Sequence, residues 1–168
     1  MKKLILSTVI MTFVLNSHAQ NFGLRAGADF ATAKASFDGL SVSENETGFY
    51  IGAFTKIKVS ESFKIRPEVN YISVKDLDQI EVPVLAEIGL SDKFNLLAGP
   101  SFGFLLDTEE GAKSFNFGAE FGLSYDLSKQ FLIEARYNLG LSNLVDDNEF
   151  NATLKLHGLF VGIGYMFN

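Results

Sequence analysis

Charged side chains recur at every second position in several stretches of this chain, where they alternate with large apolar residues. The run Lys64, Arg66 and Glu68 is one example. In an extended strand, residues i and i+2 lie on the same face. Twelve charged residues share this phase: Arg25, Asp29, Lys56, Lys58, Lys64, Arg66, Glu68, Glu81, Glu87, Glu120, Glu134 and Arg136. Six are cations and six are carboxylates, so they can pair. The chemistry that they predict is an internal network of salt bridges.

Catalysis is the second kind of chemistry to consider, and it would centre on His157. A nucleophilic site needs a nucleophile and an orienting carboxylate beside the base. Ser142 and Glu149 are the nearest candidates in sequence, but no motif joins them to His157. The strand phase directs His157 outward, so we interpret it as an interfacial residue. The chain has no Cys, which excludes a thiolate nucleophile and a Cys-ligated metal. We expect no catalytic site, cofactor or metal.

Three turns with one five-residue frame separate the stretches that carry these residues. The frame is an apolar residue, Ser, two polar residues and Phe, and it occurs at residues 59–63, 90–94 and 127–131. A short polar turn between two period-two runs predicts a β-hairpin. With longer polar loops at 34–47, 75–78, 107–114 and 145–152, the three turns predict eight strands. Pro67, Pro83 and Pro100 fall inside these strands, and we expect a bulge at each.

The two strand faces differ in a way that predicts their surroundings. The strand glycines share the charged face, and most aromatic residues lie on the other face, near the strand ends. The two predicted aromatic belts are Phe22, Phe63, Phe94, Tyr125, Phe131, Tyr165 and Phe167 at one end, and Phe30, Phe49, Tyr71, Phe104 and Phe115 at the other. A crowded polar interior inside an apolar band with aromatic belts is typical of a membrane barrel. We therefore predict an all-β fold, an eight-stranded antiparallel up-and-down transmembrane β-barrel. In the alternative, a soluble barrel, the polar face would meet water and hold few glycines.

The N-terminus is typical of an export signal. Lys2 and Lys3 precede an apolar run from Leu4 to Leu15, and Ser17-His18-Ala19 provides a cleavage site. An apolar run of about 12 residues is too short for a spanning helix, which needs about 20. We predict a cleaved signal peptide at residues 1–19 and an outer-membrane barrel domain at 20–168.

Five stretches resemble the small outer-membrane β-barrel family of Gram-negative bacteria that includes PorT-type proteins. They are residues 65–71 (IRPEVNY), 80–84 (IEVPV), 97–100 (LAGP), 134–141 (EARYNLGL) and 161–167 (VGIGYMF). The resemblance covers the whole chain after the signal peptide. It implies a structural barrel without a shared catalytic set. The aromatic-ended last strand resembles the signal that the barrel-assembly machinery reads.

These observations lead to an expectation about function. A net charge of −6 argues against nucleic-acid binding, and the interior of an eight-stranded barrel is filled by side chains. We expect a non-enzymatic monomer, surrounded by outer-membrane lipid, with a structural or interaction role at the cell surface. Two alternatives remain: a narrow porin-like conduit or transport component, and a lipid-modifying enzyme centred on His157.

Overall fold

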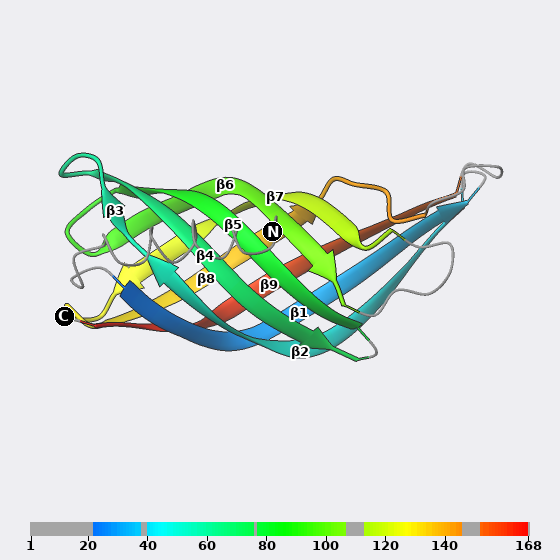
Figure 1. The fold of residues 1–168 in the computed structure, drawn as a ribbon, viewed down its shortest axis with the longest axis horizontal. Helices are drawn as coiled ribbons and strands as arrows, with labels where there is room; N and C mark the ends of the chain where they lie inside the picture. Colours follow the sequence, from blue (N-terminus) through cyan, green and yellow to red (C-terminus); the bar gives the residue numbers. More distant parts are fainter. Residues whose placement is uncertain (1–21, 38–39, 76, 107–112, 146–151, 168) are drawn as a thin grey trace, which may run out of the picture.

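The structure, a computed structural model, describes residues 22–37, 40–75, 77–106, 113–145 and 152–167. These residues form strands with short connections (Figure 1). The strands are β1 (Phe22–Phe37), β2 (Leu40–Thr55), β3 (Ile57–Lys58), β4 (Phe63–Val74), β5 (Leu77–Gly89), β6 (Phe94–Leu105), β7 (Phe115–Asp126), β8 (Phe131–Gly140) and β9 (Thr153–Met166). In these parts of the chain, no helix is long and apolar enough to cross a membrane.

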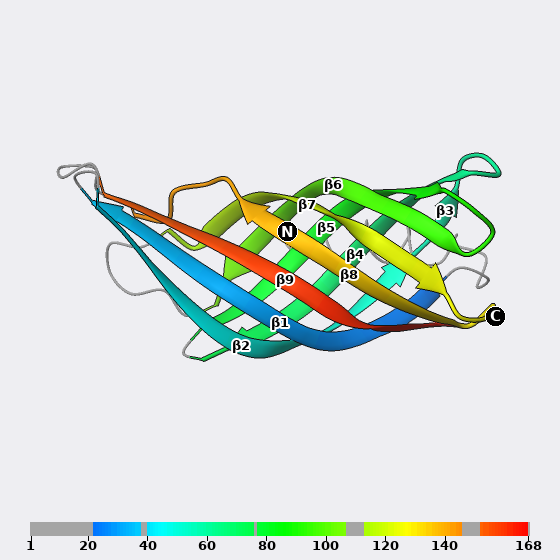
Figure 2. The ribbon, with the colours of Figure 1, turned by 180° about the vertical axis from the view of Figure 1, so that it is seen from behind.

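The strands close into a barrel. Except for β2 and β3, strands that are neighbours in sequence pair antiparallel; β1 also pairs with β9, and β2 pairs with β4 (Figures 1 and 2). β3 continues β2 along β4 in the same register after a break at Lys56, so β2 and β3 make one side of the ring. The prediction of a closed eight-stranded antiparallel barrel is confirmed.

All three repeated turns close in the same way. The Phe carbonyl oxygen at the end of each frame accepts hydrogen bonds from the backbone N–H groups of the frame's apolar residue and Ser, at 2.8–3.2 Å. In two turns the serine hydroxyl also accepts from the Phe N–H, at 3.2 Å for Ser91 and 3.0 Å for Ser128. The serine and phenylalanine of the frame therefore have a structural role at one end of the barrel.

The predicted loop at 34–47 is wrong, because β1 and β2 continue through most of it as a hairpin. They stay paired from Phe22 and Thr55 to Phe37 and Leu40. β4 reaches only to the level of Phe49, which pairs with Ser73. The far ends of β1, β2 and β9 therefore extend beyond the other strands as a three-stranded sheet (Figures 1 and 2). We call this extension the fin; it comprises residues 31–37, 40–48 and 153–156.

The predicted proline bulges are also wrong. Pro67 pairs with Val84, and the register between β4 and β5 is the same on both sides of it. The register also continues unchanged past Pro83 and Pro100. In the β4–β5 ladder and in the β5–β6 ladder, pairing is interrupted for two residues at or next to Pro83. The missing proline N–H groups therefore interrupt the ladders, but neither strand contains the extra residue that a bulge would insert.

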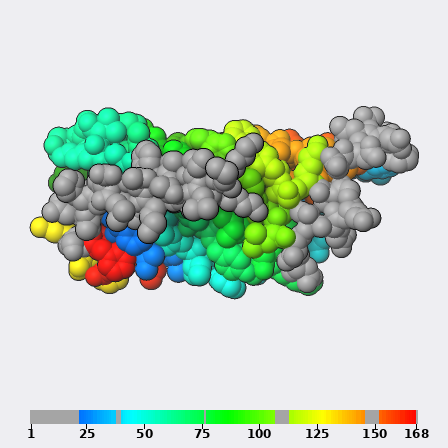
Figure 3. Space-filling model, viewed as in Figure 1, coloured from blue at the N-terminus to red at the C-terminus, as the bar shows by residue number. Residues whose placement is uncertain are grey.

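The two faces of the wall alternate as the sequence indicates. Large apolar side chains such as Leu24, Val69 and Ile163 are about half exposed on the outside, whereas Arg66, Glu81 and Glu120 are buried inside. The space-filling view, in the orientation of Figure 1, shows an elongated molecule (Figure 3). The barrel wall thus carries its apolar face outside and its polar face inside, which is the reverse of the arrangement in a soluble protein.

Candidate functional site

Three arginines and two glutamates form the centre of the barrel interior. Glu68 contacts all three guanidinium groups, at 2.5 Å from Arg25, 2.7 Å from Arg66 and 2.9 Å from Arg136. Glu134 lies 2.8 Å from Arg25 and 2.9 Å from Arg66. All five side chains are almost fully buried. Each planar guanidinium carries five donors and can therefore bridge two or three carboxylates.

The network continues toward both ends of the barrel. Toward the repeated turns, Glu87 accepts from Lys56 at 2.9 Å and from Lys64 at 3.0 Å. In the other direction, Arg136 lies 2.9 Å from Glu120. These contacts link β1, the segment at Lys56 between β2 and β3, β4, β5, β7 and β8 through charged side chains in the interior, whereas β6 and β9 contribute none to the described network.

Lys58 lies outside this network, and its predicted interior position is wrong. Its side chain is 54% exposed and its ammonium lies 2.6 Å from Glu61 in the neighbouring turn. The break at Lys56 and the short β3 place Lys58 at the rim, where the chain turns into β4. The hydrogen bond from Lys58 lowers the pKa of the Glu61 carboxyl below its usual value.

The interior charges therefore do not balance as the sequence count suggests. The buried cations are Arg25, Lys56, Arg66 and Arg136, and the buried carboxylates are Asp29, Glu68, Glu81, Glu87, Glu120 and Glu134. Lys64 reaches Glu87 from the rim with 31% of its side chain exposed. Among the described residues, no cation forms an ion pair with Asp29 or Glu81, so the negative excess is local.

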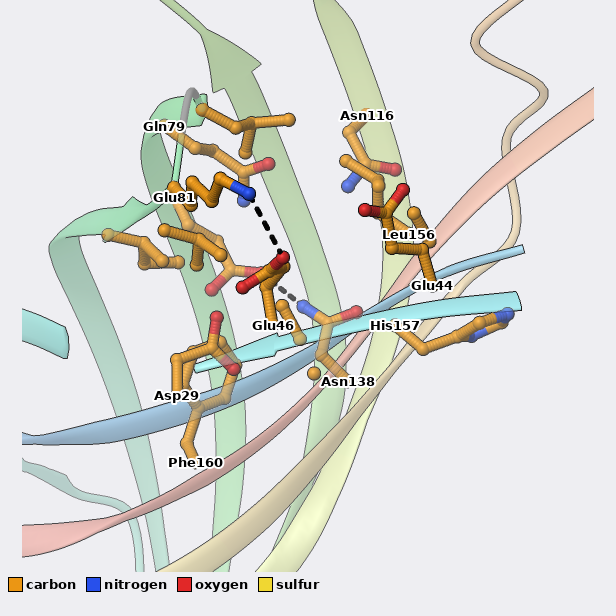
Figure 4. Close-up of a pocket in the computed structure, with 17 residues that line it drawn as sticks. Asp29, Glu44, Glu46, Gln79, Glu81, Asn116, Asn138, Leu156, His157 and Phe160 are labelled. Carbon is orange, nitrogen blue, oxygen red and sulfur yellow. Dashed lines mark hydrogen bonds and ion pairs between the residues drawn. The ribbon is translucent and has the colours of Figure 1, made fainter. Parts of the chain in front are cut away.

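Asp29 and Glu81 line a cavity at the fin end of the barrel, shown in Figure 4. Its volume is about 260 Å³. Asn138 on β8 donates to Glu81, and its amide nitrogen lies 3.0 Å from the Ser101 hydroxyl. At the rim of the cavity, Lys75 lies 3.6 Å from Glu46. We call this cavity, with its carboxylates Asp29, Glu44, Glu46 and Glu81, the mouth.

Sequence reasoning that counted only charges missed the neutral members of the interior. The guanidinium of Arg25 lies 4.3 Å from the centre of the Tyr50 ring, and that of Arg66 lies 4.0 Å from the Phe54 ring. Such cation–π contacts stabilise a buried cation. Tyr50 and Phe54 were visible in the sequence as aromatic exceptions on the polar face. Their position in the strand alternation, among the interior residues, could have indicated that they pack against the buried arginines.

The residues predicted as aromatic belts lie on the outer surface near the two ends, and several rings meet their neighbours. At the turn end, ring centres are 4.7 Å apart for Phe94 and Tyr125 and 5.0 Å for Phe131 and Tyr165. Phe22 and Phe167 stack at 5.7 Å. At the fin end, the separations are 6.4 Å for Phe49–Tyr71 and 5.3 Å for Phe104–Phe115. Phe30 is 46% exposed, and Phe63 is half-buried.

Aromatic pairs also lie between the two ends, which the belt prediction did not include. Phe102 and Phe117 are 5.6 Å apart, as are Phe121 and Tyr137. Their cross-strand neighbours place them on the outer face. The outer surface is thus aromatic along much of its height over β6, β7 and β8.

His157 lies on the outer wall above Tyr137, whose ring it stacks against at 6.3 Å. Figure 4 shows its imidazole directed away from the mouth. Ser142 is engaged elsewhere, because its hydroxyl lies 3.0 Å from Asn116 and accepts from the Phe117 N–H. Glu149 lies outside the described residues. The described geometry therefore does not assemble the predicted catalytic alternative around His157.

The class of protein follows from this arrangement: a small outer-membrane β-barrel with an apolar exterior and a polar, filled interior. A family model described as "Outer membrane protein beta-barrel domain" matches residues 5–167. The chain belongs to this family. No curated protein sequence matches it.

Solved structures agree with the fold. Ail, the attachment invasion locus protein of Yersinia pestis, is 18% identical with a TM-score of 0.51, over 88% of this chain and 99% of that chain. Neisserial surface protein A is 19% identical with a TM-score of 0.51, over 87% of this chain and 97% of that chain. A de novo designed transmembrane β-barrel gives a TM-score of 0.57 at 15% identity, over 90% and 98% of the two chains.

Proposed function

We propose that this protein is a non-enzymatic, monomeric barrel that presents the fin to a protein partner outside the cell. The fin is the observation that carries the proposal. Barrels of this kind have short periplasmic turns and longer extracellular segments. The three repeated turns would therefore face the periplasm, and the fin would project outward from the membrane.

The fin has the surface of a binding element. On the face that continues the barrel interior, Phe37, Leu40 and Val42 are 53%, 75% and 71% exposed. Ser36 precedes Phe37 and Ser41 follows Leu40, so both serines lie on the opposite face, where their hydroxyl groups hydrogen-bond to each other. Exposed apolar side chains outside a membrane span indicate a contact surface.

The edge of the fin also favours a protein partner. Residues 40–48 of β2 pair with β1, and within the described chain no strand pairs with their other edge. A free strand edge can accept an extended peptide through backbone hydrogen bonds. The opposite edge, at β9, is partly covered, because Leu154 donates to Asn143 and accepts from the Leu144 N–H.

A polyanion fits this end of the molecule poorly. One structure of Ail holds that protein with the heparin analogue sucrose octasulfate. Here the described fin residues carry two carboxylates, Glu44 and Glu46, and two cations, Lys34 and Lys155, so their charges cancel. A surface without net positive charge gives a sulfated ligand no net electrostatic attraction, so we do not extend that binding to this chain.

Photo-crosslinking in intact cells tests the proposal. A photoreactive amino acid at Val42 is expected to give discrete protein adducts, because the side chain lies on the exposed apolar face of the fin. The same amino acid at Ser91, in a turn at the other end of the barrel, is the matched control. No protein adduct from Val42, or the same adducts from both positions, would contradict the proposal.

A further inference from the structure

The mouth holds buried negative charge that no cation of the described chain neutralises. Asp29 is 3% exposed and Glu81 is 1% exposed. Asp29 Oδ1 and Glu81 Oε2 have no hydrogen-bond partner, although both residues line the cavity. A buried carboxylate is tolerated when it is paired or hydrogen-bonded. These two oxygen atoms are therefore open to a cation that enters the cavity from outside.

Among the described residues that line the mouth, Lys75 is the one Lys or Arg. Residues 38–39, 76, 107–112 and 146–151 contain no Lys, Arg or His. The ammonium of Lys75 lies beside Glu46 at the rim, and its side chain is 66% exposed. The nearest arginines already contact Glu68, Glu120 and Glu134 deeper in the barrel.

The lining indicates an organic cation and not a bare metal ion. The described residues contain no group of three or more His, Cys, Asp or Glu that could hold a metal. Apolar side chains of Ile72, Val74, Leu156 and Phe160 form part of the wall. With a volume of about 260 Å³, the cavity can hold a small molecule with both a charged and an apolar part.

The charged and apolar parts of the lining are arranged in depth. Asp29 and Glu81 are buried, whereas Glu44 and Glu46, from the fin strand β2, are exposed or half-buried. Phe160 lies beside Asp29 (Figure 4). Gly158 lies next to Asp29: a side-chain carbon added there would be 2.7 Å from Asp29 Oδ1. The glycine thus leaves room beside the unpartnered oxygen.

We propose that the mouth binds a small amphipathic organic cation, a primary amine with an apolar body. Its ammonium group would lie between Asp29 and Glu81, and its body would contact Ile72, Val74 and Phe160. An ammonium group has three donors, so it can satisfy both unpartnered oxygens at once. The amine would enter from the cell exterior, past the exposed side chains of Glu44 and Lys75.

Isothermal titration calorimetry on the folded barrel in detergent micelles tests this site. The probe is tyramine, with tyrosol as the neutral analogue and 4-hydroxyphenylacetate as the anionic analogue. We expect saturable tyramine binding, about tenfold or more weaker binding of tyrosol, and no binding of the carboxylate. Equal heats from all three compounds would indicate only partitioning into micelles or water-filled space and would overturn the proposal. The absence of saturable tyramine binding would also overturn it.

Single substitutions at the mouth test where tyramine binds. Asp29→Asn and Glu81→Gln are each expected to weaken tyramine binding by about tenfold or more, because each removes a charged acceptor. Asp92→Asn, in an exposed turn at the other end, removes the same charge and is expected to leave binding unchanged. Equal effects of Asp29→Asn and Asp92→Asn would show that only overall charge matters.

The resistance of the ligand-free protein to urea provides a second test. Without ligand, Asp29→Asn is expected to resist urea at least as well as the parent protein, because the substitution removes an unpaired buried charge. Tyramine is expected to raise the resistance of the parent and not that of the variant. A marked loss of resistance in ligand-free Asp29→Asn would mean that the carboxylate is already paired, and would overturn the proposal.

Discussion

At the scale of single residues, Glu68 holds the interior together. Its oxygens lie 2.5–2.9 Å from the guanidinium groups of Arg25, Arg66 and Arg136, whereas Glu134 reaches Arg136 only at 3.7 Å. Removing one member of a buried charge network leaves its partners uncompensated, and this costs more than the net stabilisation from the pair. The sequence predicted that Glu68 points inward, but only the folded barrel shows which cations it meets.

We expect Glu68→Gln to lower the free energy of unfolding by about 3–5 kcal/mol, because three buried guanidinium groups lose a charged acceptor. Urea unfolding in lipid vesicles measures this. Glu61→Gln is the matched control, and we expect no measurable change, because water screens the exposed Lys58–Glu61 pair. Similar shifts in the two variants would contradict the assignment of Glu68 as the centre of the network.

At the scale of the strands, glycines set how closely β1 and β9 approach. Gly27 faces Gly162 across this pair. A side-chain carbon at Gly162 would lie 2.3 Å from both the Ala26 carbonyl oxygen and the Tyr50 hydroxyl, distances that real structures do not allow. The sequence showed that glycines share the polar face; the contact that each glycine permits follows from the register and curvature of the closed sheet.

Gly162→Ala is expected to destabilise the barrel by about 1–3 kcal/mol, because the backbone of β1 cannot move away without breaking its ladder. Gly89→Ala is the control, since the nearest atoms to its added carbon would be 3.8 Å away, and we expect a change within about 0.5 kcal/mol. The fraction that migrates faster before boiling on SDS gels, compared after urea treatment, measures the difference. Equal tolerance of both substitutions would mean that the β1–β9 contact relaxes freely.

At the scale of the whole molecule, the closed ring of strands and the side chains that fill its interior both contribute to a barrel that is stable in lipid. The ring leaves no free strand edge over the membrane-spanning part, which satisfies the backbone hydrogen bonds that lipid cannot satisfy. Leu85, Leu97 and Leu132 are buried within the interior along with the charged network. Such filling favours a plug over a conduit.

We expect no steady open current from the reconstituted protein in planar lipid bilayers, because buried salt bridges occupy the interior. The double substitution Arg25→Ala/Glu134→Ala is the comparison. It removes one cation and one carboxylate that lie 2.8 Å apart, so net charge is kept while space opens. A current that appears only in this variant would support the plug. A steady current from the parent protein would instead favour the porin-like alternative.

The sequence alone determined the features that depend on local alternation. Period two showed which residues face inward, and the repeated turns showed where the hairpins lie, because both properties depend on neighbours within a few positions. The fin was missed because its strands lie outside the ring, where the apolar residues no longer alternate toward lipid. The bulges were predicted wrongly because the effect of a proline depends on which partner atoms face its missing N–H.

Only the tertiary structure decided which charges meet. Arg25 and Glu134 are far apart in sequence and lie 2.8 Å apart across the barrel. Asp29 and Glu81 have the same strand phase as these two residues and yet lack a cation. Depth along the barrel separates the two cases, and depth depends on the register of every strand around the closed ring. The local imbalance at the mouth, from which we infer an amine site, is therefore a property of closure that no stretch of sequence carries by itself.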